Sequence, residues 1–223
     1  MVQSMNIYRD RAEAGRVLAA AVLSRLPANA DAVVLGLPRG GVPVAAEVAR
    51  ALGTPLDVLV ARKLGVPGSA EVAMGAIASV GGELSVVAND ELRERVTQFA
   101  GADAWADVLA RERAELERRA EAYRGARAPV ALAGRTVVLV DDGIATGATI
   151  RAAAAAARRL EPAGLVAAAP VVLPGARTVV EASVDELICP WFPAAFLGVG
   201  QAYLDFTQTG DDEVRALLES DQA

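Results

Sequence analysis

The chain has 223 residues, of which 53% are hydrophobic and only 4% aromatic, and its formal net charge is -6. This length accommodates one large domain or two small ones, and the acidic balance excludes a general nucleic-acid binder, which would need a basic surface. The absence of histidine excludes Ser-His and Cys-His nucleophilic pairs and His-containing zinc sites, and the single cysteine, Cys189, excludes an internal disulfide.

The N-terminal part of the chain predicts alternating helices and strands. Apolar residues at helical spacing predict a helix over residues 10–26. Short apolar runs predict buried strands over residues 31–38 and 55–63, and the segment between them, residues 42–52, reads as a second helix. The Gly, Pro and Ser residues of the segment 64–71 predict a mobile loop.

Two further short strands are expected around Gly81-Gly82, and a helical insertion over residues 89–128 follows them. Asn89 is predicted to cap the first helix of this insertion. Acidic residues alternate with the arginines of the insertion, which favours a solvated helix face over a binding patch. The residues expected to pack against the core are Trp105, Leu109, Leu116, Ala120 and Tyr123.

The C-terminal part of the chain returns to the alternating pattern. Strands are predicted over residues 136–141, 165–173 and 186–190, and helices over residues 148–160 and 175–182. Alternating strands and helices are typical of an α/β fold with a doubly wound parallel sheet. We therefore expect a single domain over residues 1–223, with a small C-terminal appendage. No membrane partner is expected, since no stretch reads as a span; the uncharged run 162–176 is too short and holds three prolines.

The segment "VVLVDDGIATGAT", residues 137–149, carries the clearest chemical signal. In open α/β sheets ligands bind where strands end and helices begin, and the N-terminus of a helix attracts anions. The small residues of 146–149 allow backbone N–H groups to approach a phosphate closely. Asp141 and Asp142 would repel that phosphate, so we expect them to face neutral hydroxyls or a metal ion nearby. The segment therefore predicts a ligand with both a phosphate and a diol, namely a sugar phosphate.

These thirteen residues resemble the phosphoribosyl pyrophosphate (PRPP) motif of the type I phosphoribosyltransferases. The resemblance extends in order over residues 31–206, and the whole chain resembles an unassigned bacterial group of such proteins. It implies that the two acids hold the ribose 2′- and 3′-hydroxyls and that the loop binds the 5′-phosphate. It also implies a pentosyltransferase activity, in which a nitrogen of a nucleobase displaces pyrophosphate from PRPP with Mg²⁺ as the cofactor.

Two other segments of the N-terminal half fit this family. "LPRGGVPVA", residues 37–45, resembles its pyrophosphate loop, where an arginine offers several donors and two glycines let backbone amides approach. A cis peptide bond that does not precede proline often lies in that loop, and Pro38–Arg39 would be its place. "ARKLGVPGSAE", residues 61–71, resembles the Arg-Lys entry to the flexible catalytic loop, which implies pyrophosphate contacts.

At the C-terminal end, "CPWFPAAFLGVGQAYLDF", residues 189–206, is similar to the hood of the 6-oxopurine branch. There an aromatic residue stacks on the base, which would be Trp191 or Phe192, and the Asp of "LDF", here Asp205, lies near the metal. The same aromatic residues could instead simply close the rim of the core, and both readings remain open. We use "hood" for residues 189–210.

The resemblance thus implies roles for a defined set of residues. The catalytic residues would be Arg39, Lys63 and Asp142, and the metal contacts Asp141, Asp142 and Asp205. The substrate contacts would be Arg39, Gly40, Gly41, Arg62, Lys63, Asp141, Asp142, Gly143, Ala145, Thr146, Gly147, Ala148, Thr149, Trp191 and Phe192.

The acceptor is left open by the sequence. At the position of Ala145 the 6-oxopurine branch has an Asp that faces the base. The adenine and orotate enzymes have Ala there, as this chain does, whereas the hood looks purine-like. An alternative to the enzyme is a non-catalytic regulator that binds PRPP or a nucleotide in the same pocket. The single cysteine suits a reducing cytoplasm, and the resemblance further implies a homodimer that acts in nucleotide salvage.

Overall fold

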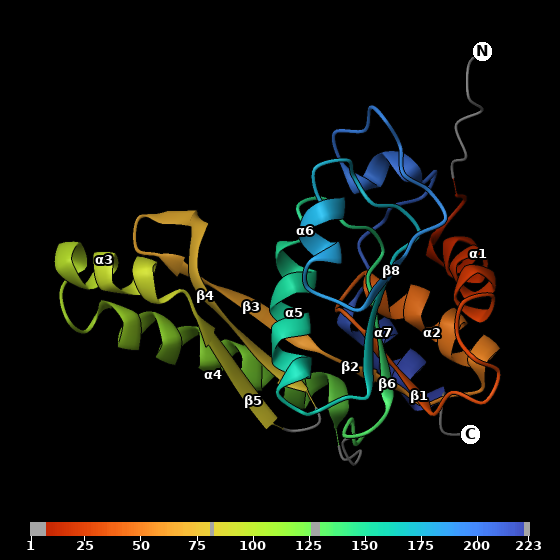
Figure 1. Cartoon of the computed structure of the whole chain (residues 1–223), viewed down its shortest axis with the longest axis horizontal. Coiled ribbons are helices and arrows are strands. Elements are labelled where there is room, and N and C mark those ends of the chain that lie inside the picture. The colour runs from red at the N-terminus through yellow and green to blue at the C-terminus, as the bar shows by residue number, and fades with distance from the viewer. Residues whose placement is uncertain (1–7, 81–82, 126–129, 221–223) are drawn as a thin grey trace.

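The computed structural model describes residues 8–80, 83–125 and 130–220. It consists of a parallel sheet with helices on both faces and of an arm, residues 60–80 and 83–125, that extends away from the sheet (Figure 1). Among the helices of these described ranges, none combines the length and the hydropathy that crossing a bilayer requires.

The central sheet has the strand order β2-β1-β6-β7-β8, and all of its strands are parallel. Its residues are buried on both faces, since Val34 and Val138 join one apolar cluster while Val33 and Val137 join another. Such continuous apolar runs are typical of parallel strands covered on both sides. This confirms the α/β fold with a doubly wound parallel sheet. The strands are β1 (Ala32–Gly36), β2 (Leu56–Val58), β6 (Thr136–Val140), β7 (Gly164–Ala168) and β8 (Glu186–Ile188).

Helices cover both faces of this sheet. On one face α1 (Arg11–Leu23) packs on α2 (Gly41–Leu52), and on the other lie α5 (Ala148–Arg158) and α6 (Arg177–Glu181) (Figure 1). The C-terminal helix α7 (Asp211–Ser220) packs against α2 and was not predicted. Its first turn holds three acidic residues, which favour a helix N-terminus.

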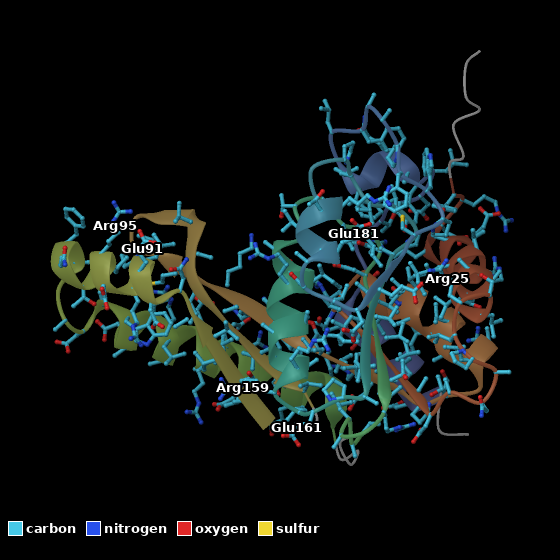
Figure 2. All side chains as sticks on the ribbon, viewed as in Figure 1. Arg25, Glu91, Arg95, Arg159, Glu161 and Glu181 are labelled. Atoms are coloured by element: carbon cyan, nitrogen blue, oxygen red, sulfur yellow. The ribbon has the colours of Figure 1, made fainter. Side chains whose placement is uncertain are left out.

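The arm contains a second, antiparallel sheet of β3 (Val60–Val66), β4 (Ser69–Val80) and β5 (Glu83–Ala88). This sheet packs against α5 as well as against α4 (Ala104–Arg124), and α3 (Asp90–Ala100) packs on α4. Figure 2 shows Glu91 and Arg95 of α3 at the outer end of the arm, away from the central sheet.

Two predictions for this region were wrong. The apolar run 55–63 is not one strand, because the chain leaves the central sheet after β2 and enters the antiparallel sheet with β3. The segment 64–71 is not a loop, since Leu64–Val66 complete β3 and β4 begins at Ser69. Only Pro67 and Gly68 form the turn, and Gly68 adopts a φ of 82°, which glycine tolerates readily.

The helical insertion forms largely as predicted. The Asn89 side chain accepts a hydrogen bond from the backbone N–H of Leu92 at 3.1 Å, so it caps α3. On α4, Leu116, Ala120 and Tyr123 are buried as expected. The last residues of the predicted insertion, 126–128, lie outside the described ranges.

Candidate functional site

The site lies at the point of the central sheet where the order of strand addition reverses. From β1 the chain continues to β2 on one side, whereas β6, β7 and β8 follow one another on the other side. Such a switch point creates a crevice outside the carboxyl ends of the strands, where open α/β sheets bind ligands. Two loops enter this crevice, and we name them the glycine loop, residues 37–41 after β1, and the acid loop, residues 141–147 after β6.

The glycine loop packs directly against the start of the acid loop. The Leu37 N–H donates to the Val140 carbonyl at 2.8 Å, and the peptide bond Pro38–Arg39 is cis, as the resemblance implied. A Cβ atom on Gly41 would lie 2.6 Å from the Val140 carbonyl oxygen, and one on Gly40 would overlap the Asp142 carboxylate. Both glycines are therefore required by the close approach of the two loops.

The two acids of the acid loop lie together, and most of the surface of each is buried. Asp141 accepts a hydrogen bond from the Asp142 N–H at 2.9 Å, and Asp142 accepts one from Arg11 Nε at 2.8 Å. Burial, with the neighbouring Asp142 charge, raises the pKa of Asp141 well above its ordinary value. Burial also raises the pKa of Asp142, and the hydrogen bond from Arg11 opposes that rise. The pair is thus a centre of negative charge that favours a cation or hydroxyl donors.

Beyond the acids, the acid loop encloses a cavity of about 130 Å³ at the start of α5. Gly147 has a φ of 76°, and Thr146 Oγ1 accepts a weak hydrogen bond from the Ala148 N–H at 3.4 Å. The first N–H groups of a helix lack intrahelical partners and carry partial positive charge, so this cavity suits an anion. It is lined by Asp141, Gly143, Ile144, Ala145, Thr146, Gly147, Ala148, Thr149 and Ile150.

Arg62 and Lys63, which the sequence assigned to one ligand, are directed differently. They are consecutive in β3, and successive side chains of a strand point to opposite faces. Arg62 forms an ion pair with Glu112 of α4 at 2.6 Å. Lys63 is exposed and lines a groove of about 610 Å³ together with Ala148 and Arg151 of α5. The structure therefore brings Lys63, but not the Arg62 guanidinium, toward the side of α5.

Arg39 lies in the glycine loop and is paired with α7. Its guanidinium lies 3.8 Å from a carboxylate oxygen of Asp211, and Asp211 also accepts a hydrogen bond from the Tyr123 hydroxyl at 2.7 Å. About a third of the Arg39 side chain is exposed, so a ligand can still reach it.

The two aromatic candidates of the hood differ in their surroundings. Trp191 packs edge-on against Tyr8 and Phe196, with ring centroids 6.2 Å and 5.0 Å apart, and belongs to an apolar cluster. Phe192 is 40% exposed and lies under the guanidinium of Arg177. Phe192 is thus exposed with Arg177 over its ring, whereas Trp191 is partly buried among other aromatic residues.

Asp205, the third acid that the resemblance assigned to the metal, lies in the hood. It is exposed, and its carboxylate accepts hydrogen bonds from the backbone N–H and the hydroxyl of Thr207 at 2.9 and 2.6 Å, which lower its pKa. Within the ranges that the structure describes, no three Asp, Glu or Cys side chains are placed to hold a metal ion.

Sequence reasoning missed two residues that contact Asp142. One is Arg11, the first residue of α1, and the other is Tyr203, whose hydroxyl donates to the Asp142 carbonyl at 2.5 Å. Arg11 is 131 positions away from Asp142, so no local pattern links the two. The only signal at Arg11 was its place just after the helix-capping Asp10.

Comparison with known proteins agrees with this geometry. The phosphoribosyl transferase domain family matches residues 4–200. A protein named "putative phosphoribosyl transferase" from Mycobacterium tuberculosis strain H37Rv is 47% identical over 215 residues, which cover 96% of this chain but 47% of that protein, so the chain spans about half its length. The crystal structure of TT1426 from Thermus thermophilus is 42% identical with a TM-score of 0.82, covering 96% of this chain and 98% of that one. The chain belongs to the phosphoribosyl transferase domain family.

Proposed function

We propose that this protein transfers the phosphoribosyl group of PRPP to a nitrogen atom of a nucleobase-like acceptor and releases pyrophosphate. The observation that carries the proposal is the contact between the two loops. Neither Gly40 nor Gly41 leaves room for a Cβ atom against the acid loop, so the glycine loop, which we take as the diphosphate site, adjoins two acids and the cavity at the start of α5. PRPP carries a 5′-phosphate, a ribose diol and a diphosphate, and these three parts match the three parts of the site.

Each part of PRPP has a proposed partner. The 5′-phosphate binds in the cavity of the acid loop, where backbone N–H groups and the hydroxyls of Thr146 and Thr149 donate to it. The ribose hydroxyls donate to Asp141 and Asp142. The diphosphate binds at the glycine loop, where Arg39 offers several donors in a fixed geometry.

The residues present fit a Mg²⁺ ion that arrives with PRPP. Carboxylates are the ligands that Mg²⁺ prefers, and the ion usually keeps water and substrate oxygens as its other ligands. Asp141 and Asp142 would hold it, and a cation there would offset the burial and the neighbouring Asp142 charge that raise the pKa of Asp141. The ion would neutralise charge on the departing diphosphate. Asp205 is left outside this set.

The chain's own cations assist the departure of pyrophosphate. In the reaction the acceptor nitrogen forms a bond to C1 of the ribose and gives its proton to water, while the bond from C1 to the diphosphate oxygen breaks with its electron pair. Negative charge therefore builds on the diphosphate, where Arg39 stabilises it, and Lys63 approaches from the groove beside α5. Arg62 instead orders the arm through its ion pair with Glu112.

The acceptor is proposed to bind between the acid loop and the hood. Ala145 is exposed beside the anion cavity, and Phe192 offers a partly exposed ring on which a base can stack. Stacking contributes roughly 1–3 kcal/mol per base in other proteins. We also propose that residues 1–223 form one domain and that the protein acts in the cytoplasm as a homodimer in nucleotide salvage.

Calorimetry with PRPP and MgCl₂, followed by isotope exchange between pyrophosphate and PRPP across a panel of bases, tests the proposal. We expect binding, and exchange with at least one base. Asp142→Asn should weaken PRPP binding without unfolding the protein, and Asp185→Asn, which alters an acid near β7 and α5 rather than the site, serves as its control. Binding without exchange for any base would favour the alternative, a regulator, and no binding at all would refute both.

A further inference from the structure

The most constrained charged residue beside the site is Arg11. Its Nε donates to Asp142 Oδ2 at 2.8 Å, and its Nη1 donates to the Thr207 carbonyl at 2.7 Å. Its guanidinium also lies over the ring of Phe206, 4.2 Å from the centroid. These contacts tie the start of α1 to the acid loop and to the hood.

The Arg11–Asp142 ion pair is more deeply buried than the Arg16–Glu47 pair, which also involves α1. The side chains of Arg11 and Asp142 are only 12% and 15% exposed, whereas Arg16, on the same helix, is 53% exposed and lies 3.8 Å from Glu47. Exposed pairs contribute little because water screens them, whereas removing one partner of a buried pair leaves an uncompensated charge. The Arg11–Asp142 pair therefore fixes the position of a carboxylate, which an exposed pair does not do.

The geometry of arginine suits this task. Its planar guanidinium directs several donors at fixed angles, so Nε and Nη1 orient the Asp142 carboxylate relative to the hood at the same time. The Tyr203 hydroxyl holds the backbone carbonyl of the same residue. Asp142 is thus held through its backbone by the hood and through Oδ2 by Arg11.

Arg11 also lies against the glycine loop. A Cβ atom placed on Gly40 would come within 3.1 Å of Arg11 Nε as well as overlapping Asp142. The guanidinium therefore stands at the meeting point of the loop assigned to the diphosphate and the acid assigned to the ribose.

We propose that Arg11 is a positioning residue that holds the Asp142 carboxylate where it binds the ribose hydroxyls. This inference rests on the proposed function, because it takes the ligand to be a ribose 5-phosphate compound. A positioning role differs from a purely structural one, because replacing Arg11 should then weaken the recognition of the diol and leave phosphate binding unchanged.

The test compares two ligands by calorimetry in the presence of MgCl₂. Ribose 5-phosphate carries both the phosphate and the diol, whereas ethyl phosphate carries only the phosphate and probes the anion cavity. In Arg11→Ala we expect the affinity for ribose 5-phosphate to fall about tenfold or more, the scale of a hydrogen bond to a charged group. The affinity for ethyl phosphate should stay within about twofold, because Arg11 does not line that cavity.

Two further variants complete the design. Arg11→Lys keeps the charge but not the planar fork, so it should show the same selective loss to a smaller extent, and it decides the matter if Arg11→Ala does not fold. Arg16→Ala, the matched control on α1, should leave both affinities unchanged.

The outcomes separate the inference from the proposed function. Equal weakening of both ligands by the Arg11 variants, or no weakening of either, overturns the positioning role while wild-type binding of ribose 5-phosphate still supports the function. If the wild-type protein binds neither ribose 5-phosphate nor PRPP, the proposed function fails, and the inference fails with it.

Discussion

Replacement of Gly41 by alanine tests most directly how the two loops are joined. The added Cβ would lie 2.6 Å from the Val140 carbonyl oxygen and 2.9 Å from the Asp141 Cα. Both neighbours belong to the backbone at the end of β6, so no side-chain rotation can relieve the overlap. The loops must therefore move apart.

Two opposing effects set the magnitude for Gly41→Ala. Overpacking of this kind typically costs about 1–3 kcal/mol. Gly41 is also the first residue of α2, and alanine is favoured over glycine by up to about 1 kcal/mol inside a helix, though by less at its first position. The overlap dominates, and the net loss should be about 1–2 kcal/mol. For a chain of this size that corresponds to a fall in Tm of about 2–8 °C.

Thermal unfolding and calorimetry with PRPP and MgCl₂ measure both consequences. We expect the lower Tm, and we expect the Kd for PRPP to rise at least about tenfold. That factor corresponds to a loss of about 1.4 kcal/mol in binding free energy. Gly175→Ala is the matched control, because a Cβ atom there meets no heavy atom within 4 Å. A Gly41→Ala protein that melts and binds like the wild type would refute the account of the loop contact.

Three further predictions concern the surroundings of the site. Lys63→Ala should slow turnover while leaving Tm within about a degree, because the side chain is exposed; undiminished exchange would remove Lys63 from the mechanism. Arg62→Ala should lower the free energy of unfolding in urea by about 1 kcal/mol, since it removes one of the two arginines that hydrogen-bond the Glu112 carboxylate and leaves only Arg111, whereas Arg113→Ala in an exposed pair should have little effect; equal effects would contradict this reading. Burial raises the pKa of the Cys189 thiol to about 12, so at pH 8 the thiol should react slowly with a disulfide reagent until urea unfolds the protein. Because the folded protein keeps the thiol protonated more strongly than the unfolded chain does, the free energy of unfolding should fall as the pH rises from about 9 toward 12. Rapid labelling of the folded protein at pH 8 would contradict this.

The central sheet could be predicted because its signals are local. Each strand is a short apolar run, and each helix between strands repeats apolar residues at its own period. The arm was harder, because the run 55–63 stays apolar while it passes from one sheet to another at Leu59. The Pro and Gly residues of 64–71 suggested a loop, although Pro67 and Gly68 alone reverse the direction of the chain between β3 and β4.

The site was predictable only in part, for a related reason. The two loops could be identified because each joins a strand to a helix within a few residues. The contacts of Arg11 with Asp142 and of Arg39 with Asp211 join residues more than a hundred positions apart, and only the tertiary fold brings them together. The orientation of Arg62 was missed because it depends on the side of the strand that faces α4.

The first described residue, Tyr8, is hydrogen-bonded to the hood. Tyr8 exchanges backbone hydrogen bonds with Ala202 and Leu204 at 2.8 Å each, and its hydroxyl donates to the Pro170 carbonyl at 3.0 Å. The family match ends at residue 200, before Ala202 and Leu204 and before α7. A protein shortened to end at residue 200 would therefore lose these two backbone hydrogen bonds, which hold the residue before α1 against the hood. Domain boundaries for expression should be drawn beyond Leu204.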